Sequence, residues 1–106
     1  MFIQVTPDFA VRLEETQDFK HFKLVIAADR SALARIRLAL EGAATLTEDG
    51  HAWVSEDWLR SRAKDASWQE GLSAMIAVAR KYGWIDEAAK TIRAHVEWAD
   101  GAALKS

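Results

Sequence analysis

Hydrophobic and polar residues alternate most regularly near the end of the chain, over residues 91–98. Apolar side chains occupy every second position of this segment, and polar side chains lie between them. Such alternation is typical of a strand with one buried face. A helix over 85–98 stays open as an alternative, because the apolar positions also fit a helical period. We predict the strand, since the alternation is complete.

The pattern predicts four strands in all. Residues 21–27 contain a short apolar run with a β-branched centre, which favours a buried strand over a helix. We also place strands near residues 1–5 and 50–54, the second directly after a turn at 47–50.

Residues 7–17 fit two different structures. Thr6 followed by Pro7 resembles the start of a helix, with Thr6 as the N-cap. Val11 and Leu13, however, alternate with polar residues, as they would in one arm of a hairpin. We predict a helix over 7–17.

Two helices are expected in the middle of the chain. Asp29 or Ser31 can cap a helix that runs to about Glu41, because their side-chain oxygens can accept hydrogen bonds from the first turn. A short helix capped by Ser55 follows and extends to about Ala63.

The clearest helix covers residues 68–82. Ser67 and Glu70 match a capping box, in which each side chain bonds a free backbone N–H of the first turn. Gly83 marks the end of this helix. Its apolar stripe, at spacings of three and four, consists of Trp68, Leu72, Met75, Ile76, Ala79 and Tyr82.

Together these elements predict an α+β fold: a short antiparallel or mixed sheet with two or three helices on one face. A chain of 106 residues has the size of one domain, which we place at 1–106 with 100–106 as a frayed tail. The alternative is an all-α bundle, in which 85–98 is helical and 20–41 forms one long helix.

Composition narrows the class of protein. The chain has no cysteine, which excludes a disulfide scaffold, a thiolate nucleophile and cysteine-based metal sites. The sequence shows neither an apolar run that could cross a membrane nor a signal peptide. Lys and Arg number 14 against 16 Asp and Glu, interspersed, so we expect no nucleic-acid and no membrane partner. We expect a soluble, cytoplasmic protein.

Familiar catalytic motifs are missing from the sequence. The glycines are too scattered for a phosphate loop, and no GxSxG sequence occurs. The spacing of His21, His51 and His95 does not require them to converge, so we predict no metal site and no cofactor. His51 is the candidate for acid–base chemistry, because Asp49 on the preceding turn could orient its imidazole. In the simpler interpretation, Asp49 only shapes the turn.

Tryptophan is frequent, with five in the chain. Trp68 and Trp98 lie on predicted core stripes. Trp53, Trp58 and Trp84 lie near turns or helix ends, which makes them the candidates for a ligand pocket or a subunit interface. Core packing accounts for these three as well, since tryptophan buries a large apolar area.

The sequence suggests a function only in outline. We expect a non-catalytic binding or assembly module that self-associates as a homodimer, because one small core leaves much apolar material to cover. The alternative is a small enzyme or small-molecule binder, in which Asp49 orients His51 and tryptophans line the pocket. Neither a ligand nor a reaction can be named from the sequence.

Overall fold

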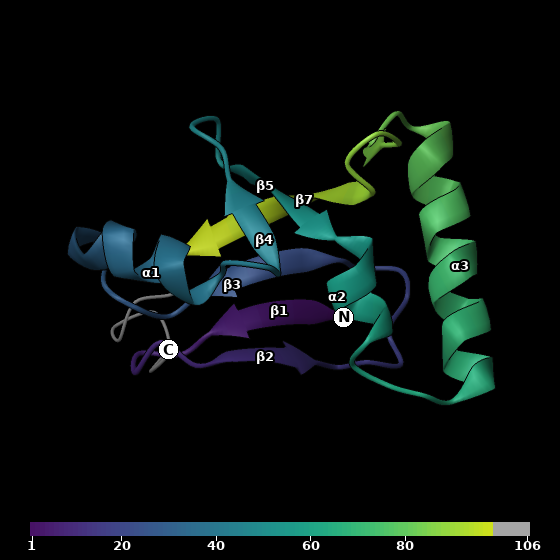
Figure 1. Cartoon of the computed structure of the whole chain (residues 1–106), viewed down its shortest axis with the longest axis horizontal. Helices are drawn as coiled ribbons and strands as arrows, with labels where there is room; N and C mark the ends of the chain where they lie inside the picture. The colour runs from purple at the N-terminus through teal and green to yellow at the C-terminus, as the bar shows by residue number, and fades with distance from the viewer. Residues whose placement is uncertain (99–106) are drawn as a thin grey trace.

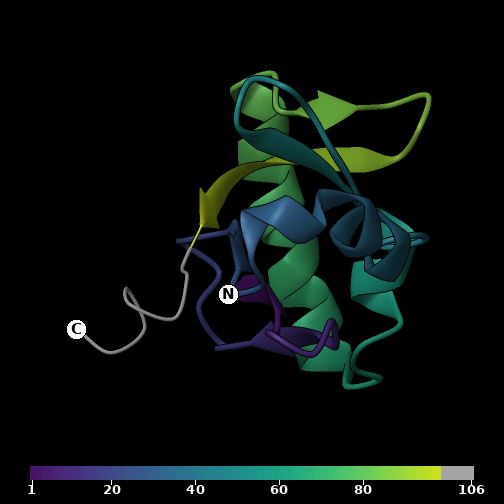
Figure 2. The same cartoon turned by 90° about the vertical axis from the view of Figure 1, so that its left-hand side faces the viewer.

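A computed structural model describes residues 1–98 and shows a mixed β-sheet with three α-helices, which confirms the predicted α+β class. The sheet is curled, with α3 at one end and α1 at the other (Figures 1 and 2). The strands are β1 (Phe2–Val5), β2 (Val11–Glu14), β3 (Lys23–Ile26), β4 (Ala44–Leu46), β5 (His51–Ser55), β6 (Ile85–Asp86) and β7 (Thr91–Trp98). The helices are the 3-10 turn η1 (Arg30–Ala32), α1 (Leu33–Ala39), α2 (Glu56–Arg60) and α3 (Ala66–Lys81). The tail predicted at 100–106 lies outside the described residues.

Strand β7 is central to the sheet, whose order is β2-β1-β3-β7-β5-β4. Strand β3 runs parallel to both β1 and β7, and the other pairs are antiparallel. Strand β5 pairs with β7 along one of its two edges. The other side is shared: β6 pairs with Thr91 and Ile92, and β3 pairs from His95 onward. Residues 93 and 94 therefore lie in a gap between β6 and β3, where the Arg93 N–H donates to the carbonyl of Trp84, the residue directly before β6.

The four predicted strands are present as β1, β3, β5 and β7. Along β7, Ile92, Ala94 and Val96 are buried, whereas the residues between them are at least partly exposed. The helical alternative for 85–98 is wrong, because β7 makes ladder hydrogen bonds with neighbours on both sides. The all-α alternative fails with it.

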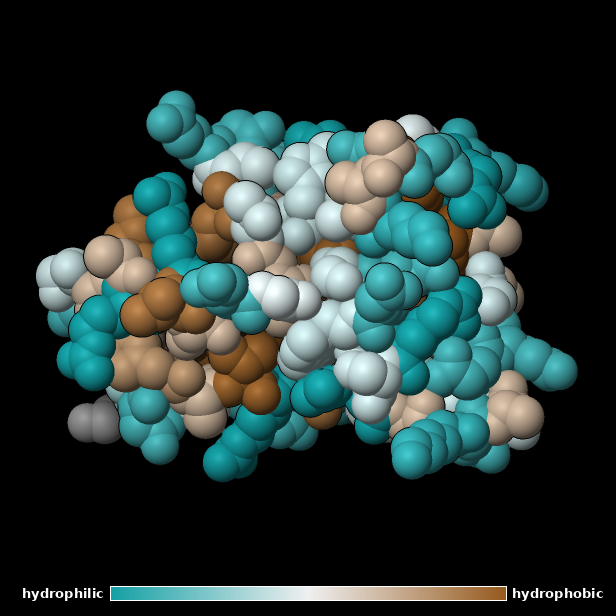
Figure 3. All heavy atoms as spheres, viewed as in Figure 1, coloured by the Kyte–Doolittle hydropathy of each residue, from teal (hydrophilic) through white to brown (hydrophobic). Residues whose placement is uncertain are grey.

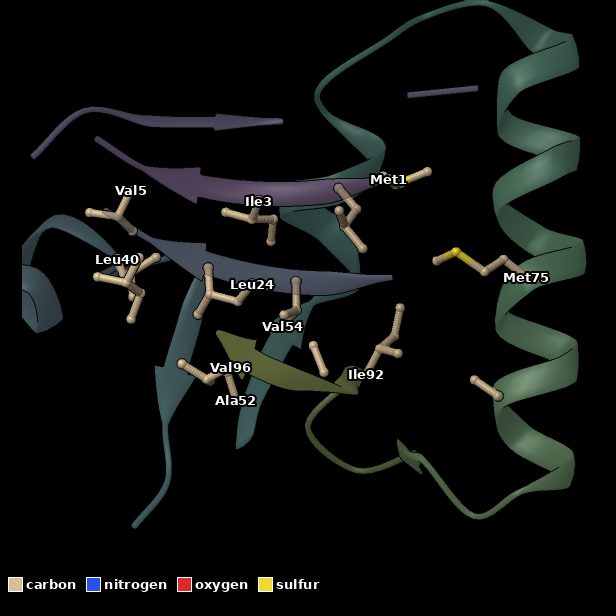
Figure 4. Close-up of a cluster of buried hydrophobic side chains, with 14 of the residues drawn as sticks. Met1, Ile3, Val5, Leu24, Leu40, Ala52, Val54, Met75, Ile92 and Val96 are labelled. Carbon is tan, nitrogen blue, oxygen red and sulfur yellow. The ribbon is translucent and has the colours of Figure 1, made fainter. Parts of the chain in front are cut away.

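One core fills the inner side of the curled sheet, and all three α-helices contribute buried side chains to it. Figure 4 shows Met75 pointing from α3 toward Met1, directly before β1, and toward Ile92, near the start of β7. Leu40, directly after α1, lies beside Val5 at the other end. The helices thus close the sheet from two ends, and removal of this apolar area from water stabilises the fold.

Two predicted caps are confirmed. The Asp29 carboxylate accepts a hydrogen bond from the Ser31 N–H at 2.9 Å, and the Ser55 hydroxyl accepts one from the Trp58 N–H at 3.2 Å. The first helix begins with η1 and ends at Ala39, close to the predicted boundary. Helix α2 is shorter than predicted.

The helix predicted at 7–17 is wrong; the segment is a turn followed by β2. The Thr6 N–H donates to the Ala10 carbonyl at 2.8 Å, and the Ala10 N–H donates to the Thr6 hydroxyl at 2.9 Å. Phe9 adopts a φ of 67°, which a helix does not allow. These bonds close a hairpin, in which Val11 and Leu13 pair with β1.

The predicted capping box at Ser67 and Glu70 is also wrong, because α3 begins two residues earlier. The Asp65 carboxylate is the N-cap and accepts a hydrogen bond from the Trp68 N–H at 3.2 Å. Both side chains can cap, but the negative charge of Asp65 is further stabilised by the helix dipole. Ser67 lies inside the first turn.

The apolar stripe of α3 is buried as predicted except at its end. Trp68, Leu72 and Ile76 face the core together with Met75 and Ala79. Tyr82 is 65% exposed, because the helix has ended and its ring lies beyond the core.

The molecular surface is mixed in character. On the face shown in Figure 3, hydrophobic atoms form separate areas divided by hydrophilic side chains. Within residues 1–98, no helix combines the length and the apolar character that a membrane span requires. In the described part of the chain, the exposed large hydrophobic side chains are Leu38, Val78, Tyr82 and Trp84.

Candidate functional site

A groove of about 770 Å³ opens where β7, α3 and the segment before β3 meet. Its floor is apolar, with Met75 and Ala79 from α3 and with Ile92 and Ala94 from β7. The groove lies at the gap along β7 between β6 and β3. Its volume is within the range of small-molecule sites, which is about 300–1,000 Å³.

The rim of the groove is rich in basic side chains. All three histidines of the chain line it, together with two lysines and one arginine. Among residues 1–98, no Asp or Glu lines it. The six basic residues are Lys20, His21, Lys23, His51, Arg93 and His95.

Strand register places three of these residues in one row. Lys23 of β3 pairs with His95 of β7, and His95 pairs in turn with His51 of β5. Paired residues on neighbouring strands present their side chains on the same face, about 5 Å apart. The ring centroids of His51 and His95 are 6.0 Å apart, edge to face. Arg93 lies two residues before His95 and therefore belongs to the same face.

Phe19 forms part of one wall because a glycine lies opposite it on α3. A Cβ atom at Gly71 would come within 2.5 Å of the Phe19 ring, so a larger residue would displace the ring. The ring also packs on Trp68, with 6.2 Å between centroids, and the Trp68 Nε1–H donates to the Thr16 carbonyl at 2.8 Å. These contacts hold the segment before β3 against α3.

Trp84 forms another part of the wall, and its backbone is held on two sides. The N–H groups of Gly83 and Trp84 donate to the carbonyls of Arg80 and Ala79, at 3.1 and 3.0 Å. This is a Schellman motif, which needs the positive φ of 75° that Gly83 adopts. The Arg93 N–H donates to the Trp84 carbonyl at 2.7 Å. The end of α3 and the start of β7 thus position the indole.

The predicted pair of Asp49 and His51 is brought together. Asp49 Oδ1 lies 3.4 Å from His51 Nδ1, but Arg93 Nη2 lies 3.3 Å from the same nitrogen. A guanidinium only donates and needs an unprotonated Nδ1, whereas a carboxylate only accepts and needs a protonated one. One tautomer cannot satisfy both contacts. The geometry therefore does not hold His51 in the single orientation that acid–base catalysis requires.

Three carboxylates pair with the basic side chains from outside the groove. Asp49, which also lies beside His51, pairs with Arg93, and the other two carboxylates each pair with one rim residue. The pairs are Asp18 Oδ2 with His21 Nδ1 at 3.2 Å, Glu97 Oε2 with Lys23 Nζ at 3.2 Å, and Asp49 Oδ2 with Arg93 Nη2 at 3.7 Å. Within residues 1–98, neither Lys20 nor His95 makes such a pair.

Hydrogen bonds keep two of these carboxylates ionised. The Thr47 hydroxyl donates to Asp49, and this bond, with smaller contributions from His51, lowers the pKa of Asp49. The backbone N–H of Lys20 is the main cause of the lowered pKa of Asp18. Both groups therefore carry negative charge at neutral pH.

Of the three tryptophans proposed for a pocket, Trp84 lines the groove and the other two do not. Trp58 packs against the core, with the Arg62 guanidinium 4.6 Å from its ring centroid. Trp53 is half-buried on β5, opposite Arg93 in the strand register.

Most of the rim was not predicted from the sequence. Arg93 and His95 are two of the polar positions within the predicted strand 91–98, and neither they nor His21 were assigned to a site. The alternation along β7 did place His95 and Arg93 on one face, which was the available signal. Their proximity to His51 and Lys23 depends on strand pairing, which alternation does not specify.

Comparison of the chain with family models, curated proteins and solved structures gives no match. The site therefore has to be interpreted from its own chemistry. Within the part of the chain that the structure describes, no three His, Asp or Glu side chains are grouped to hold a metal ion. The arrangement offers an apolar floor, aromatic walls and a basic rim.

Proposed function

We propose that the chain is a non-catalytic binding module, whose groove holds a small molecule with an apolar ring. The observation that carries the proposal is the lining of the groove: Phe19, Phe22 and Trp84 surround an apolar floor, and polar groups are confined to the rim. Small-molecule sites combine a mostly apolar surface with a few polar groups in this way. The competing contacts at His51 support binding rather than catalysis. A cytoplasmic location, in keeping with the absence of cysteine, is part of the proposal.

The neutral aromatic probe 2-naphthalenesulfonamide tests this function. We expect it to shift the NMR signals of the Trp84 indole N–H and of the backbone at residues 92–95. An affinity of about 1 mM or tighter is expected, because ligands of this size gain about 0.3 kcal/mol per non-hydrogen atom. Absence of shifts at millimolar probe, or shifts confined to other surfaces, would contradict the proposal.

Trp84→Ala and Leu38→Ala form a matched pair of variants. Trp84→Ala should weaken probe binding by about threefold to tenfold, since an aromatic pair contributes about 0.5–1.5 kcal/mol. Leu38 is 69% exposed on α1, at the end of the sheet away from the groove, so Leu38→Ala should leave the affinity unchanged. Equal effects of the two substitutions would show that binding is not at the groove.

Self-association as a homodimer is a second candidate, supported by an apolar area beside the groove. Val78 and Tyr82 lie one turn apart on and after α3, and the Tyr82 ring stacks on Trp84 with 4.8 Å between centroids. Their exposed fractions are 52%, 65% and 43% for Val78, Tyr82 and Trp84. Exposed apolar areas of this kind are typical of contact surfaces.

Sedimentation equilibrium distinguishes the two candidates. A dimer should form at about 100 μM or below, and Tyr82→Ser should shift it toward the monomer. Because Val78 and Trp84 belong to both surfaces, the naphthalene probe should also dissociate such a dimer. A monomer at every concentration would remove the homodimer and leave the binding function unaffected.

A further inference from the structure

We infer that the ligand of the groove is an organic anion, and that its binding takes up protons through His21, His51 and His95. The inference rests on the proposed function, since it concerns the same groove. It specifies that the ligand is negatively charged and that the groove binds it more tightly at lower pH.

The balance of charge around the groove favours an anionic ligand. The charged groups that face the three imidazoles come from the N-terminus, the segment before β3, β3 itself, the turn before β5 and β7. The positive groups are Lys20, Lys23, Arg93 and the ammonium of Met1, which lies 3.7 Å from Asp18 Oδ2; the negative groups are Asp18, Asp49 and Glu97. With neutral imidazoles these four positive and three negative groups leave one positive charge in excess. Each protonated imidazole adds a further positive charge that the groove does not compensate.

The hydrogen-bond donors of the groove are placed to bind a single anionic head group. Lys23, His95 and His51 form a row across three neighbouring strands, and Arg93 lies beside this row on the same face. An anionic head group at this row would accept hydrogen bonds from an ammonium, a guanidinium and protonated imidazoles. Hydrogen bonds between ionised partners are about twice as strong as neutral ones. The apolar residues that line the same groove, Met75 and Ala79 of α3 among them, accommodate the remainder of the ligand.

The direction of the pH dependence follows from these charges. Histidine is the side chain that ordinarily changes charge between about pH 5 and 8. An anion in the groove favours the protonated imidazole over the neutral one. By linkage, the affinity for the anion therefore rises as the pH falls, and binding takes up protons from solution.

The test compares 2-naphthalenesulfonate with 2-naphthalenesulfonamide by titration calorimetry. The two probes share the ring and the tetrahedral head, but the sulfonate is an anion and the sulfonamide is neutral. From about pH 8 to about pH 6, we expect the sulfonate to bind about fivefold tighter or more. The sulfonamide should bind with the same affinity at both pH values. Proton uptake should make the heat of sulfonate binding depend on the ionisation enthalpy of the buffer.

The variant that carries His21→Gln, His51→Gln and His95→Gln should bind the sulfonate with little dependence on pH. The single variant His95→Gln, at an exposed position, should take up fewer protons and keeps the test usable if the triple variant does not fold. Lys64→Gln removes an exposed charge outside the groove and should leave the pH dependence intact.

Each alternative outcome is distinct. Equal binding of both probes at every pH would overturn this inference but support the proposed function. A pH dependence that survives loss of the three histidines would place the proton uptake elsewhere and overturn it. Failure of both probes to bind would remove the proposed function, and this inference with it.

Discussion

Gly71 lies in the middle of α3, where glycine costs about 0.8–1.0 kcal/mol relative to alanine. Glycine nevertheless suits this position, because the Phe19 ring occupies the space that a Cβ atom would need. The ring is confined in turn by Trp68, so it cannot move away freely. One missing side chain thus lets the segment before β3 pack against α3 and form a wall of the groove.

Gly71→Ala should destabilise the protein in spite of its better helix propensity. Overpacking costs about 1–3 kcal/mol, which exceeds the propensity gain of about 1 kcal/mol. Denaturant melts measure the change in unfolding free energy. Phe19→Leu in the same chain should recover part of the loss, because a smaller side chain leaves room for the new methyl group. A variant more stable than the parent would contradict this account.

At the scale of elements, α3 depends on a polar cap at its start and an apolar stripe along its length. Asp65 satisfies the N–H of Trp68, and Ser67 makes no capping bond. Along the stripe, Leu72 and Ile76 are buried against the sheet and the neighbouring segments. A cap and a buried apolar side chain contribute different amounts to the unfolding free energy, so substitutions of the two should have different effects.

Asp65→Ala should lower the unfolding free energy by about 0.5–2 kcal/mol, the usual contribution of an N-cap. Ser67→Ala is the control, and it should change the stability by no more than about 0.5 kcal/mol because Ser67 is an exposed position. Urea unfolding of both variants provides the comparison. A larger loss for Ser67→Ala than for Asp65→Ala would show that the helix begins later.

Ile76→Ala should cost more than either cap substitution. Removal of a buried isoleucine loses transfer free energy and leaves a cavity, at about 2–5 kcal/mol. Since small domains are stable by about 5–15 kcal/mol, this change alone could unfold a marginal one. Thermal and urea melts would measure the change, with Val78→Ala as an exposed control on the same helix. A loss below about 1 kcal/mol would mean that the core does not include this position.

At the scale of the whole molecule, four carboxylates couple stability to pH. The pKa values of Asp8, Asp18, Asp29 and Asp49 are all lowered by hydrogen bonds made in the folded state. A lowered folded pKa means that the native state binds protons less readily than the unfolded chain. These groups therefore stabilise the fold above about pH 4, and this stabilisation is lost as the pH falls through their lowered pKa values.

Asp29→Asn isolates one of these contributions. The principal cause of the lowered pKa of Asp29 is the hydrogen bond from the Ser31 N–H, which an asparagine oxygen can also accept. The variant should keep the cap but lose its titration. Melting temperatures measured from about pH 5 to about pH 2.5 should therefore fall less steeply than in the parent. Identical slopes would show that Asp29 does not contribute.

The sequence alone determined those features that neighbouring residues decide. The alternation along 91–98 predicted β7, and the caps at Asp29 and Ser55 were recognisable because capping is a contact between residues two or three apart. Where two local structures competed, the pattern was not sufficient. At 7–17 a helix start and a hairpin arm were both plausible, and pairing with β1 stabilised the hairpin.

The groove was decided only by the tertiary structure. His21, His51 and His95 are far apart in the chain, and they meet because β3 and β5 pair with opposite sides of β7 in a particular register. If the pairing register of β7 slipped by one residue, His95 would turn toward the core. The local pattern of β3 or β5 does not specify which residues of β7 these strands pair with. Register depends on how the buried faces fit together across the whole sheet. The sequence placed His51 and His95 at polar positions of strands and His21 near the start of another, and the packing of the core decided that all three line one groove.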